Sequence, residues 1–117
     1  MLGAARRRIR HVGVLAKARR TSLERLRRAR AGSILVLCHG NIYRSPFVER
    51  KLATALSPDG WALRSAGFHE RVQRPCTREY VELAEKYGVS LADHRSRQVT
   101  VRDLQDADIV VIMDRKN

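Results

Sequence analysis

A chain of 117 residues is long enough for one domain, and its 44% of hydrophobic residues is ordinary for a folded protein. No apolar run approaches the roughly 18 residues that a membrane-spanning helix needs, which argues against a membrane span. Two cysteines in different contexts do not form a disulfide framework, and the arginine-rich N-terminus lacks the apolar segment of a secretory signal. A reducing, cytoplasmic location is therefore expected.

The net charge of +12 is concentrated at the N-terminus. Residues 1–32 hold 11 Lys and Arg and one acidic residue, whereas residues 33–117 hold 13 basic and 11 acidic residues. We interpret residues 1–32 as a basic arm. It is either a solvated extension or a surface attracted to an anionic membrane, a nucleic acid or an acidic phosphorylated substrate. The arm has no aromatic residue, which argues against base stacking.

A helix is predicted within this arm. The run Thr-Ser-Leu-Glu at 21–24 is typical of a capping box at a helix N-terminus. Leu23 and Leu26 would then face inward, and Gly32 would end the helix. The arm is therefore expected to lead, as a basic helix, into a domain that covers residues 33–117.

The next segment, SILVLCHGNIYRSP at 33–46, carries the most information. Its apolar run 34–37 is too short for a helix and favours a strand buried on both faces. Pro46 is tolerated in the first turn of a helix, and apolar residues follow it at helical spacing. The sequence thus predicts a strand, a loop that starts with Cys38, and a helix that begins at Ser45.

The predicted loop has the residues of a phosphate site. Five residues separate Cys38 from Arg44, a spacing at which loop amides can converge on one tetrahedral anion beside the helix N-terminus. The helix dipole, the amides and Arg44 each favour the nucleophilic thiolate form of Cys38. Arg44 can also bind two phosphate oxygens at once, and Ser45 could donate its hydroxyl to the thiolate. The expected phosphate-binding residues are His39, Gly40, Asn41, Ile42, Tyr43 and Arg44.

After the loop, strands and helices alternate. A turn signal at 57–60 precedes a strand at 61–65, and a helix is predicted over 77–87. Thr100 and Asp103 are spaced to cap a short helix.

A continuous apolar run at 108–113 predicts a third, buried strand. The order of the elements predicts an α/β fold, a doubly wound, flavodoxin-like parallel sheet with flanking helices. The loop that begins at Cys38 should lie at the carboxyl end of its strand.

These residues resemble the signature of the low-molecular-weight protein tyrosine phosphatases, which is a cysteine, five residues, arginine, serine and proline with Gly-Asn inside the loop. Further stretches that look like the same family follow in the same order at 65–67, 94–100 and 108–114, so that the resemblance covers 33–117. The matching loop residues are Cys38, Gly40, Asn41, Ile42, Arg44, Ser45 and Pro46.

The resemblance implies an activity and a role for each matched residue. It implies hydrolysis of phosphotyrosine, in a protein or as a small aryl phosphate, through a phosphocysteine and with release of inorganic phosphate. Cys38 would be the nucleophile, and Arg44 would clamp the phosphate. The polar network that holds the loop would consist of Asn41, Ser45, Ser65 and His94.

The chain also departs from the family pattern. The family's general acid is an aspartate in an Asp-Pro segment beyond the Met-Asp strand end, and this sequence stops at Asn117 before such a segment. Acid catalysis of this kind is typically worth about 10²–10⁴-fold, so slow hydrolysis of phosphotyrosine is expected. The family's last strand and helix would also be missing, which would leave apolar surface uncovered. Asp114 is the best substitute acid in the sequence.

Two other functions stay open. The missing acid would explain a phosphate-binding or oxyanion-binding protein of the same fold without useful turnover. An arsenate reductase shares this fold and loop but needs two further thiols, of which the sequence supplies only Cys76. No cofactor is expected, and the sequence has no cluster of ligands that predicts a structural metal.

Overall fold

The computed structural model describes residues 2–56 and 60–113, with side chains described from residue 13 onward. The chain divides into two compact units, Met1–Arg30 and Ala31–Asn117. The first contains helix α1 (Leu2–Arg28), and the second contains all other described elements. The turn predicted at 57–60 lies mostly outside the described residues.

Helix α1 is one uninterrupted helix of 27 residues, so the capping box predicted at 21–24 is wrong. The preceding residues are rich in Ala and Arg, which are good helix formers, and extending a helix costs much less than starting one. Leu23 and Leu26 are 44% and 45% exposed rather than facing inward. Gly32 does not end the helix, because it is already the first residue of the following strand.

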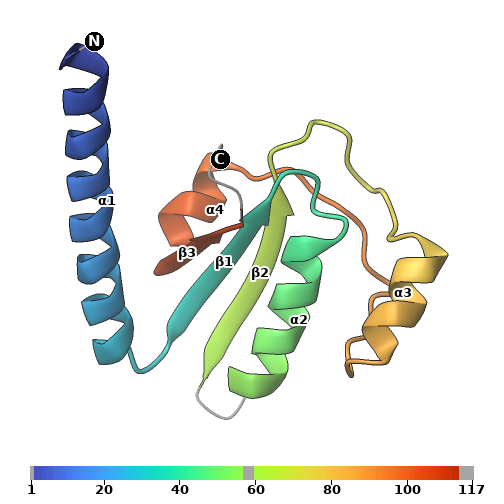
Figure 1. Ribbon diagram of the computed structural model, residues 1–117. Helices are drawn as coiled ribbons and strands as arrows, with labels where there is room; N and C mark the ends of the chain where they lie inside the picture. Colours follow the sequence, from blue (N-terminus) through green and yellow to red (C-terminus); the bar gives the residue numbers. More distant parts are fainter. Residues whose placement is uncertain (1, 57–59, 114–117) are drawn as a thin grey trace. The chain divides into compact units, whose positions relative to one another are not determined.

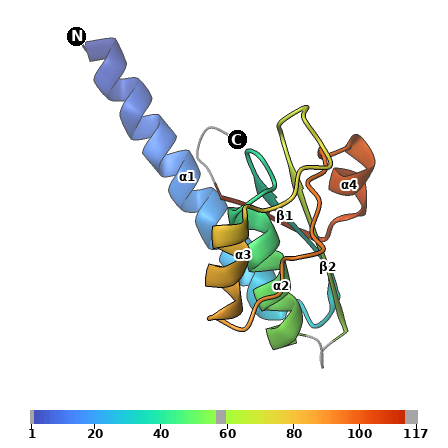
Figure 2. The same ribbon diagram turned by 90° about the vertical axis from the view of Figure 1, so that its right-hand side faces the viewer.

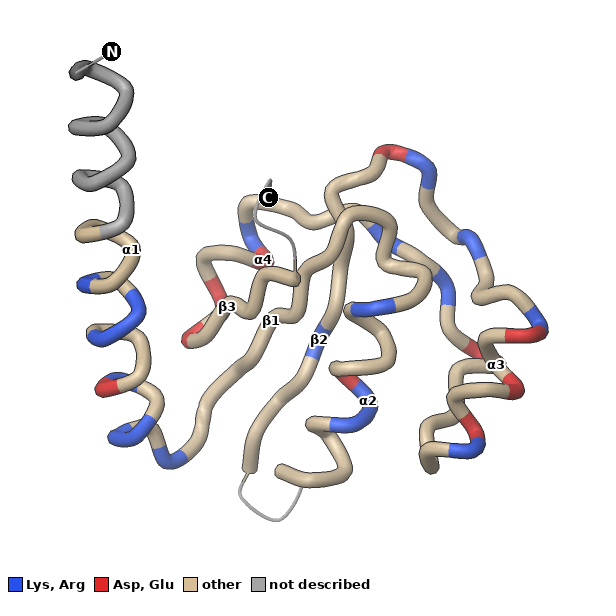
Figure 3. The backbone as a smooth tube through the Cα atoms, viewed as in Figure 1, with Lys and Arg blue, Asp and Glu red and all other residues tan. Residues whose placement is uncertain are grey.

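The described part of α1 is strongly basic. Lys and Arg recur along it, with Glu24 as the acidic position among them (Figure 3). Within the described residues, no helix combines the length and the apolar character needed to cross a membrane.

A three-stranded parallel sheet forms the centre of the second unit (Figure 1). The strand order is β2-β1-β3, and the first strand is buried from Ile34 to Cys38, as its apolar run predicted. The α/β fold with a parallel sheet is thereby confirmed. The strands are β1 (Gly32–Cys38), β2 (Trp61–Gly67) and β3 (Ile109–Ile112).

Helices cover both faces of this sheet. Figure 2 shows α2 (Arg44–Leu56) and α3 (Arg78–Glu85) on one side and α4 (Val101–Asp106) on the other. The predicted helix over 77–87 corresponds to α3, for which Thr77 is the N-cap residue.

Two apolar clusters form the core. One joins the sheet to the segment around α4, and the other joins α2 to α3. The first consists of Leu35, Leu37 and Ala66, with Phe68, Val99 and Ala107 packed against them. The second consists of Cys76, Ala84, Val89 and Leu91, with Phe47, Tyr80 and Val81.

Strand β3 is less buried than its apolar sequence predicted. Val110 is 38% exposed and Ile112 is 49% exposed. In the register they lie beside Leu35 and Leu37, which are buried. The difference arises because β3 is an edge strand, which pairs only with β1 among the described residues, so these side chains stand at the margin of the core.

The capping box predicted at Thr100 and Asp103 is present at the start of α4. The Thr100 hydroxyl accepts the backbone N–H of Asp103 at 3.1 Å, and the Asp103 carboxylate accepts that of Thr100 at 2.8 Å. The carboxylate is 7% exposed and also binds both terminal nitrogens of Arg97, at 2.8 and 3.0 Å. These hydrogen bonds from Arg97 hold the pKa of Asp103 well below its usual range, although burial acts in the opposite direction.

The replacement Asp103→Asn is expected to destabilise the chain at neutral pH by about 1–3 kcal/mol, because a charge-assisted pair is lost. The folded-state pKa lies below the unfolded value of about 3.9, so this stabilisation is complete above that value and is lost as the pH falls further. Urea unfolding at pH 7 and at pH 3 should show that the gap between the two chains narrows at the lower pH. An equal gap at both pH values would contradict a role for the charge.

Candidate active site

The segment from Cys38 to Arg44 forms a loop between the carboxyl end of β1 and the first turn of α2 (Figure 1). α2 begins at Arg44, one residue before the predicted start. Cys38 is only 2% exposed, and Ser45 and Pro46 are buried in the first turn of the helix. The buried strand and the buried helix start therefore fix both ends of the loop.

Among the described residues, two groups lie within hydrogen-bond distance of the Cys38 sulfur. The backbone N–H of Asn41 donates to it at 3.2 Å, and Ser45 Oγ lies 3.0 Å from it. Both contacts suit a thiolate, the form in which cysteine acts as a nucleophile.

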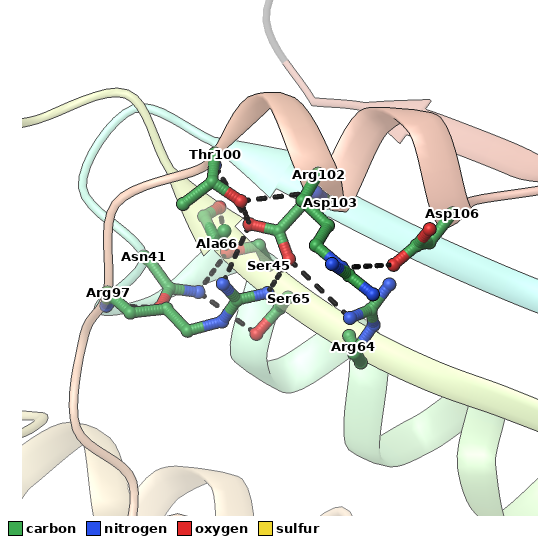
Figure 4. A network of polar contacts seen from close by, with 10 residues as sticks. All are labelled: Asn41, Ser45, Arg64, Ser65, Ala66, Arg97, Thr100, Arg102, Asp103 and Asp106. Carbon is green, nitrogen blue, oxygen red and sulfur yellow. Dashed lines mark hydrogen bonds and ion pairs between the residues drawn. The ribbon is translucent and has the colours of Figure 1, made fainter.

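Asn41 joins several elements through polar contacts, and Figure 4 shows it with Ser45, Ser65 and Arg97. It is fully buried and has a φ of 53°, a left-handed conformation that asparagine tolerates better than most residues. Its Nδ2 donates to Ser45 Oγ at 2.8 Å and to Ser65 Oγ at 2.9 Å. Its backbone carbonyl lies 2.7 Å from His94 Nε2, and His94 is also buried. The structure thus brings together the four residues that the resemblance assigned to the network.

The loop carbonyls from 39 to 43 all point to partners outside the loop. A loop whose carbonyls bind partners outside it can direct its N–H groups at an anion, and that of Asn41 already donates to the Cys38 sulfur. The carbonyl of His39 accepts from the backbone N–H groups of Phe68 (2.8 Å) and His69 (2.9 Å), Gly40 from Arg74 (3.3 Å), Asn41 from His94 (2.7 Å), Ile42 from Cys76 Sγ (2.9 Å) and Tyr43 from the Tyr80 hydroxyl (2.9 Å).

Gly67, at the end of β2, lies against the back of the loop. A Cβ atom there would come within 2.8 Å of Asn41 N and of His39 O. Both are backbone atoms that already make hydrogen bonds, Asn41 N to the Cys38 sulfur and His39 O from the N–H groups of Phe68 and His69, so neither can move without disturbing these bonds. Only glycine fits this contact.

The replacement Gly67→Ala is expected to lower the free energy of unfolding by about 1–3 kcal/mol, the usual cost of overpacking. Urea denaturation measures it, with Gly13→Ala in α1 as the control, since a Cβ at Gly13 meets nothing within 4 Å. An unchanged midpoint for Gly67→Ala would mean that the loop yields at this contact.

A cavity of about 270 Å³ lies over the loop. None of the described residues that line it carries a carboxyl group. Arginine and histidine side chains supply its polar wall, so the cavity suits an anion. Its lining residues are Cys38, His39, Gly40, Ile42, Tyr43, Arg44, His69 and Arg74.

Arg44 lines this cavity and also donates to the Met113 carbonyl, just beyond β3, at 3.4 Å. Its guanidinium therefore lies between the loop and the carboxyl end of the edge strand. The candidate substitute acid, Asp114, is the next residue along the chain and lies outside the described residues.

The family model described as "Low molecular weight phosphotyrosine protein phosphatase" matches residues 33–117. The chain belongs to this family. The Escherichia coli K12 low molecular weight protein-tyrosine-phosphatase Etp is 38% identical over 85 residues, which are 73% of this chain and 56% of Etp. The probable phosphatase AmsI of Erwinia amylovora is 40% identical over 85 residues, which are 73% of this chain and 58% of AmsI.

Solved structures of the family agree with the fold. The crystal structure of the Erwinia amylovora tyrosine phosphatase AmsI matches with a TM-score of 0.64 over 73% of this chain and 55% of that one. Wzb of Vibrio vulnificus, solved in complex with benzylphosphonate, matches with a TM-score of 0.66, 31% identity and coverage of 73% and 60%. The chain thus spans little more than half the length of the phosphatases that it matches.

Three residues of the site were not singled out as part of it from the sequence. Glu49 Oε2 accepts the Ser65 hydroxyl at 2.7 Å, and its position four residues after Ser45, on the same helix face, was a usable signal. Arg74 and Cys76 reach the loop from a segment without periodicity, so no pattern placed them. Burial raises the pKa of the Cys76 thiol, opposed in part by nearby arginines, so this thiol stays protonated and donates to the loop.

Proposed function

We propose that this chain hydrolyses phosphate monoesters through a phosphocysteine at Cys38, with phosphotyrosine or a small aryl phosphate as substrate. The observation that carries the proposal is the buried Cys38 sulfur, which lies 3.0 Å from the Ser45 hydroxyl in the first turn of α2 and 3.2 Å from the backbone nitrogen of Asn41 in the loop. Membership of the phosphatase family and the benzylphosphonate complex of Wzb support an aromatic phosphate as ligand.

The reaction has two displacement steps. The Cys38 thiolate attacks phosphorus, the P–O bond to the aryl group breaks, and the aryl oxygen leaves with the electron pair. Arg44 and the loop N–H groups stabilise the equatorial oxygens. Water then attacks phosphorus, the S–P bond breaks, and Ser45 donates a hydrogen bond to the departing thiolate. Phosphate is released.

The first step depends on the leaving group. A tyrosine oxygen needs a proton as it departs, and no described residue of the cavity lining offers a carboxylic acid. The nitrophenolate that leaves from para-nitrophenyl phosphate is a weak base and needs almost no protonation. We therefore propose that this chain hydrolyses phosphotyrosine about 10²–10⁴-fold more slowly than an enzyme with a general acid does. Its hydrolysis of an activated ester should be little affected.

The test is hydrolysis of para-nitrophenyl phosphate beside a phosphotyrosine peptide, with rapid acid quenching and peptide mass analysis. Phosphate attached to Cys38 in quenched samples supports the mechanism. Turnover without such an adduct, or no turnover of either ester by a folded chain, contradicts it. If the peptide is also turned over, Asp114→Asn should slow the peptide far more than the nitrophenyl ester, provided that Asp114 is the acid.

A second function, oxyanion binding without turnover, is favoured by the basic lining of the cavity, in which no described residue carries a carboxyl group. Phosphate or vanadate should raise the unfolding temperature of the chain, and Arg44→Ala should remove the effect. Protection without hydrolysis would assign this function. No protection would contradict both proposals.

We also propose that the chain is cytoplasmic. We further propose that the exposed basic side chains of α1 attract anionic surfaces. Arg19 and Arg20 are exposed, as are the other described basic side chains from Lys17 to Arg28. Retention of the chain on heparin should fall steeply with salt and weaken in Arg19→Glu/Arg20→Glu. Equal retention of both chains would contradict a role for the arm.

A further inference from the structure

We propose that Glu49 is a positioning residue for Cys38. Together with the Arg97 backbone N–H, its carboxylate holds one direction in a hydrogen-bond chain that runs through Ser65, Asn41 and Ser45 and ends with Ser45 donating its proton to the Cys38 sulfur. The inference deepens the proposed function and rests on it, since it concerns the same nucleophile.

The orientation of the Asn41 carboxamide is set first. The backbone N–H of Arg97 donates to Asn41 Oδ1 at 3.0 Å, so the oxygen faces Arg97 and Nδ2 faces the two serines (Figure 4). An amide nitrogen has two hydrogens. Both are used, because Nδ2 lies 2.8 Å from Ser45 Oγ and 2.9 Å from Ser65 Oγ.

Ser65 links this amide to Glu49. Because Ser65 Oγ accepts from Asn41, its own proton is free for the Glu49 carboxylate, 2.7 Å away. An ionised carboxylate can only accept. It therefore requires Ser65 to donate toward Glu49 and to accept from Asn41, which is the same amide orientation that Arg97 selects. The Arg97 N–H and the Glu49 carboxylate thus favour the same orientation of the Asn41 carboxamide.

Ser45 ends the chain. It accepts from Asn41, so its proton must go to another acceptor. The Cys38 sulfur lies 3.0 Å away and the Ala66 carbonyl 3.5 Å away, so the sulfur is the nearer acceptor. Ser45 is fully buried and Ser65 is 5% exposed, which leaves no bulk water to replace a lost partner. With the Asn41 N–H, the sulfur then receives two hydrogen bonds.

The hydrogen bond from Ser65 to Glu49 stabilises the Cys38 thiolate by orienting the network. The negative charge of Glu49 has the opposite effect on the thiolate, because like charges repel through space. The cavity over the sulfur is lined by Arg44, Arg74, His39 and His69, and Arg97, which pairs with Asp103, donates its backbone N–H to Asn41. These groups are unchanged when only Glu49 is replaced. The sign of the effect of removing Glu49 therefore separates direction from charge.

The test is the rate of alkylation of Cys38 by iodoacetamide between about pH 5 and 9, read at the Cys38 peptide by mass spectrometry. Glu49→Ala is expected to slow alkylation at neutral pH about tenfold and to move the midpoint of the pH profile upward. Glu49→Gln, which keeps an acceptor oxygen, should recover most of the rate. Glu85→Ala, which removes an exposed carboxylate from α3, is the matched control and should change nothing.

A double-mutant cycle identifies the route of the effect. In a Ser45→Ala background, Glu49→Ala should cause no further slowing, because the last donor is already absent. If Glu49→Ala slows alkylation by the same factor with Ser45 present and with Ser45 replaced, Glu49 does not act through Ser45. Unchanged or faster alkylation in Glu49→Ala would also overturn the proposal, the latter by showing that charge repulsion dominates.

Alkylation needs no turnover, so this test stands apart from the proposed function. A chain that hydrolyses no ester but shows the expected alkylation pattern would reject the activity and keep the role of Glu49. Circular dichroism checks that each variant is folded. If Glu49→Ala does not fold, Ser65→Ala breaks the same link, and an unchanged alkylation rate in that variant would contradict the inference.

Discussion

The Cys38→Ser chain is expected to turn over para-nitrophenyl phosphate at least about 10⁴-fold more slowly than the unaltered chain. A serine hydroxyl in the same place is almost wholly protonated at neutral pH, and no described carboxylate or free imidazole base contacts the position of the sulfur. The loop itself should persist, because the strand and helix that hold it are unchanged. Initial rates at saturating ester concentration measure the loss.

The matched control is the other cysteine. Cys76 donates to the Ile42 carbonyl at 2.9 Å, and a serine hydroxyl can make the same donation. Cys76→Ser is therefore expected to keep most of the activity. A Cys38→Ser chain as active as the control would show that the phosphatase activity arises elsewhere than at this loop.

Asn41→Ala is expected to lower the free energy of unfolding by about 3–5 kcal/mol, the largest effect expected from any loop residue. The side chain makes two buried hydrogen bonds, to Ser45 and Ser65, and accepts a partly buried one from the Arg97 backbone N–H. Removing the side chain deprives Ser45, Ser65 and Arg97 of one hydrogen bond each. Ser45 and Ser65 are buried, so water does not replace the lost bonds there. Urea denaturation at neutral pH measures the change.

Part of that cost belongs to the backbone, because Asn41 has a φ of 53°. Asn41→Gly loses the same side-chain bonds but adopts this conformation freely, so it should be more stable than Asn41→Ala by about 1 kcal/mol. If either variant unfolds at the same urea concentration as the unaltered chain, the network does not support the loop.

The fold could be predicted because its signals are local. The apolar run before Cys38 and the proline after Arg44 set a strand and a helix on either side of one loop, and the parallel sheet follows from the alternation of elements. Exposure was harder to predict. The apolar run of β3 is the same whether a strand is central or at an edge, so the half-exposure of Val110 and Ile112 had no signal in the sequence. The run 21–24 failed because a capping motif works only where a helix starts.

Some supporting residues of the site could be predicted from the sequence, and others could not. Ser65 and His94 were placed by resemblance, and the structure brings both to Asn41. Arg74 and Cys76 come from an irregular segment whose path depends on tertiary contacts, and no periodicity encodes such a path. Their hydrogen bonds to loop carbonyls are visible only in three dimensions.

The outward bonds of the loop carbonyls from 39 to 43 also determine how an anion is received. Each bond fixes a peptide plane independently of any ligand. Little conformational entropy is then left to lose on association, because the loop was ordered when the chain folded. The receptor is rigid, so capture should be limited by diffusion and by the attraction of Arg44 and Arg74 rather than by a rearrangement of the backbone.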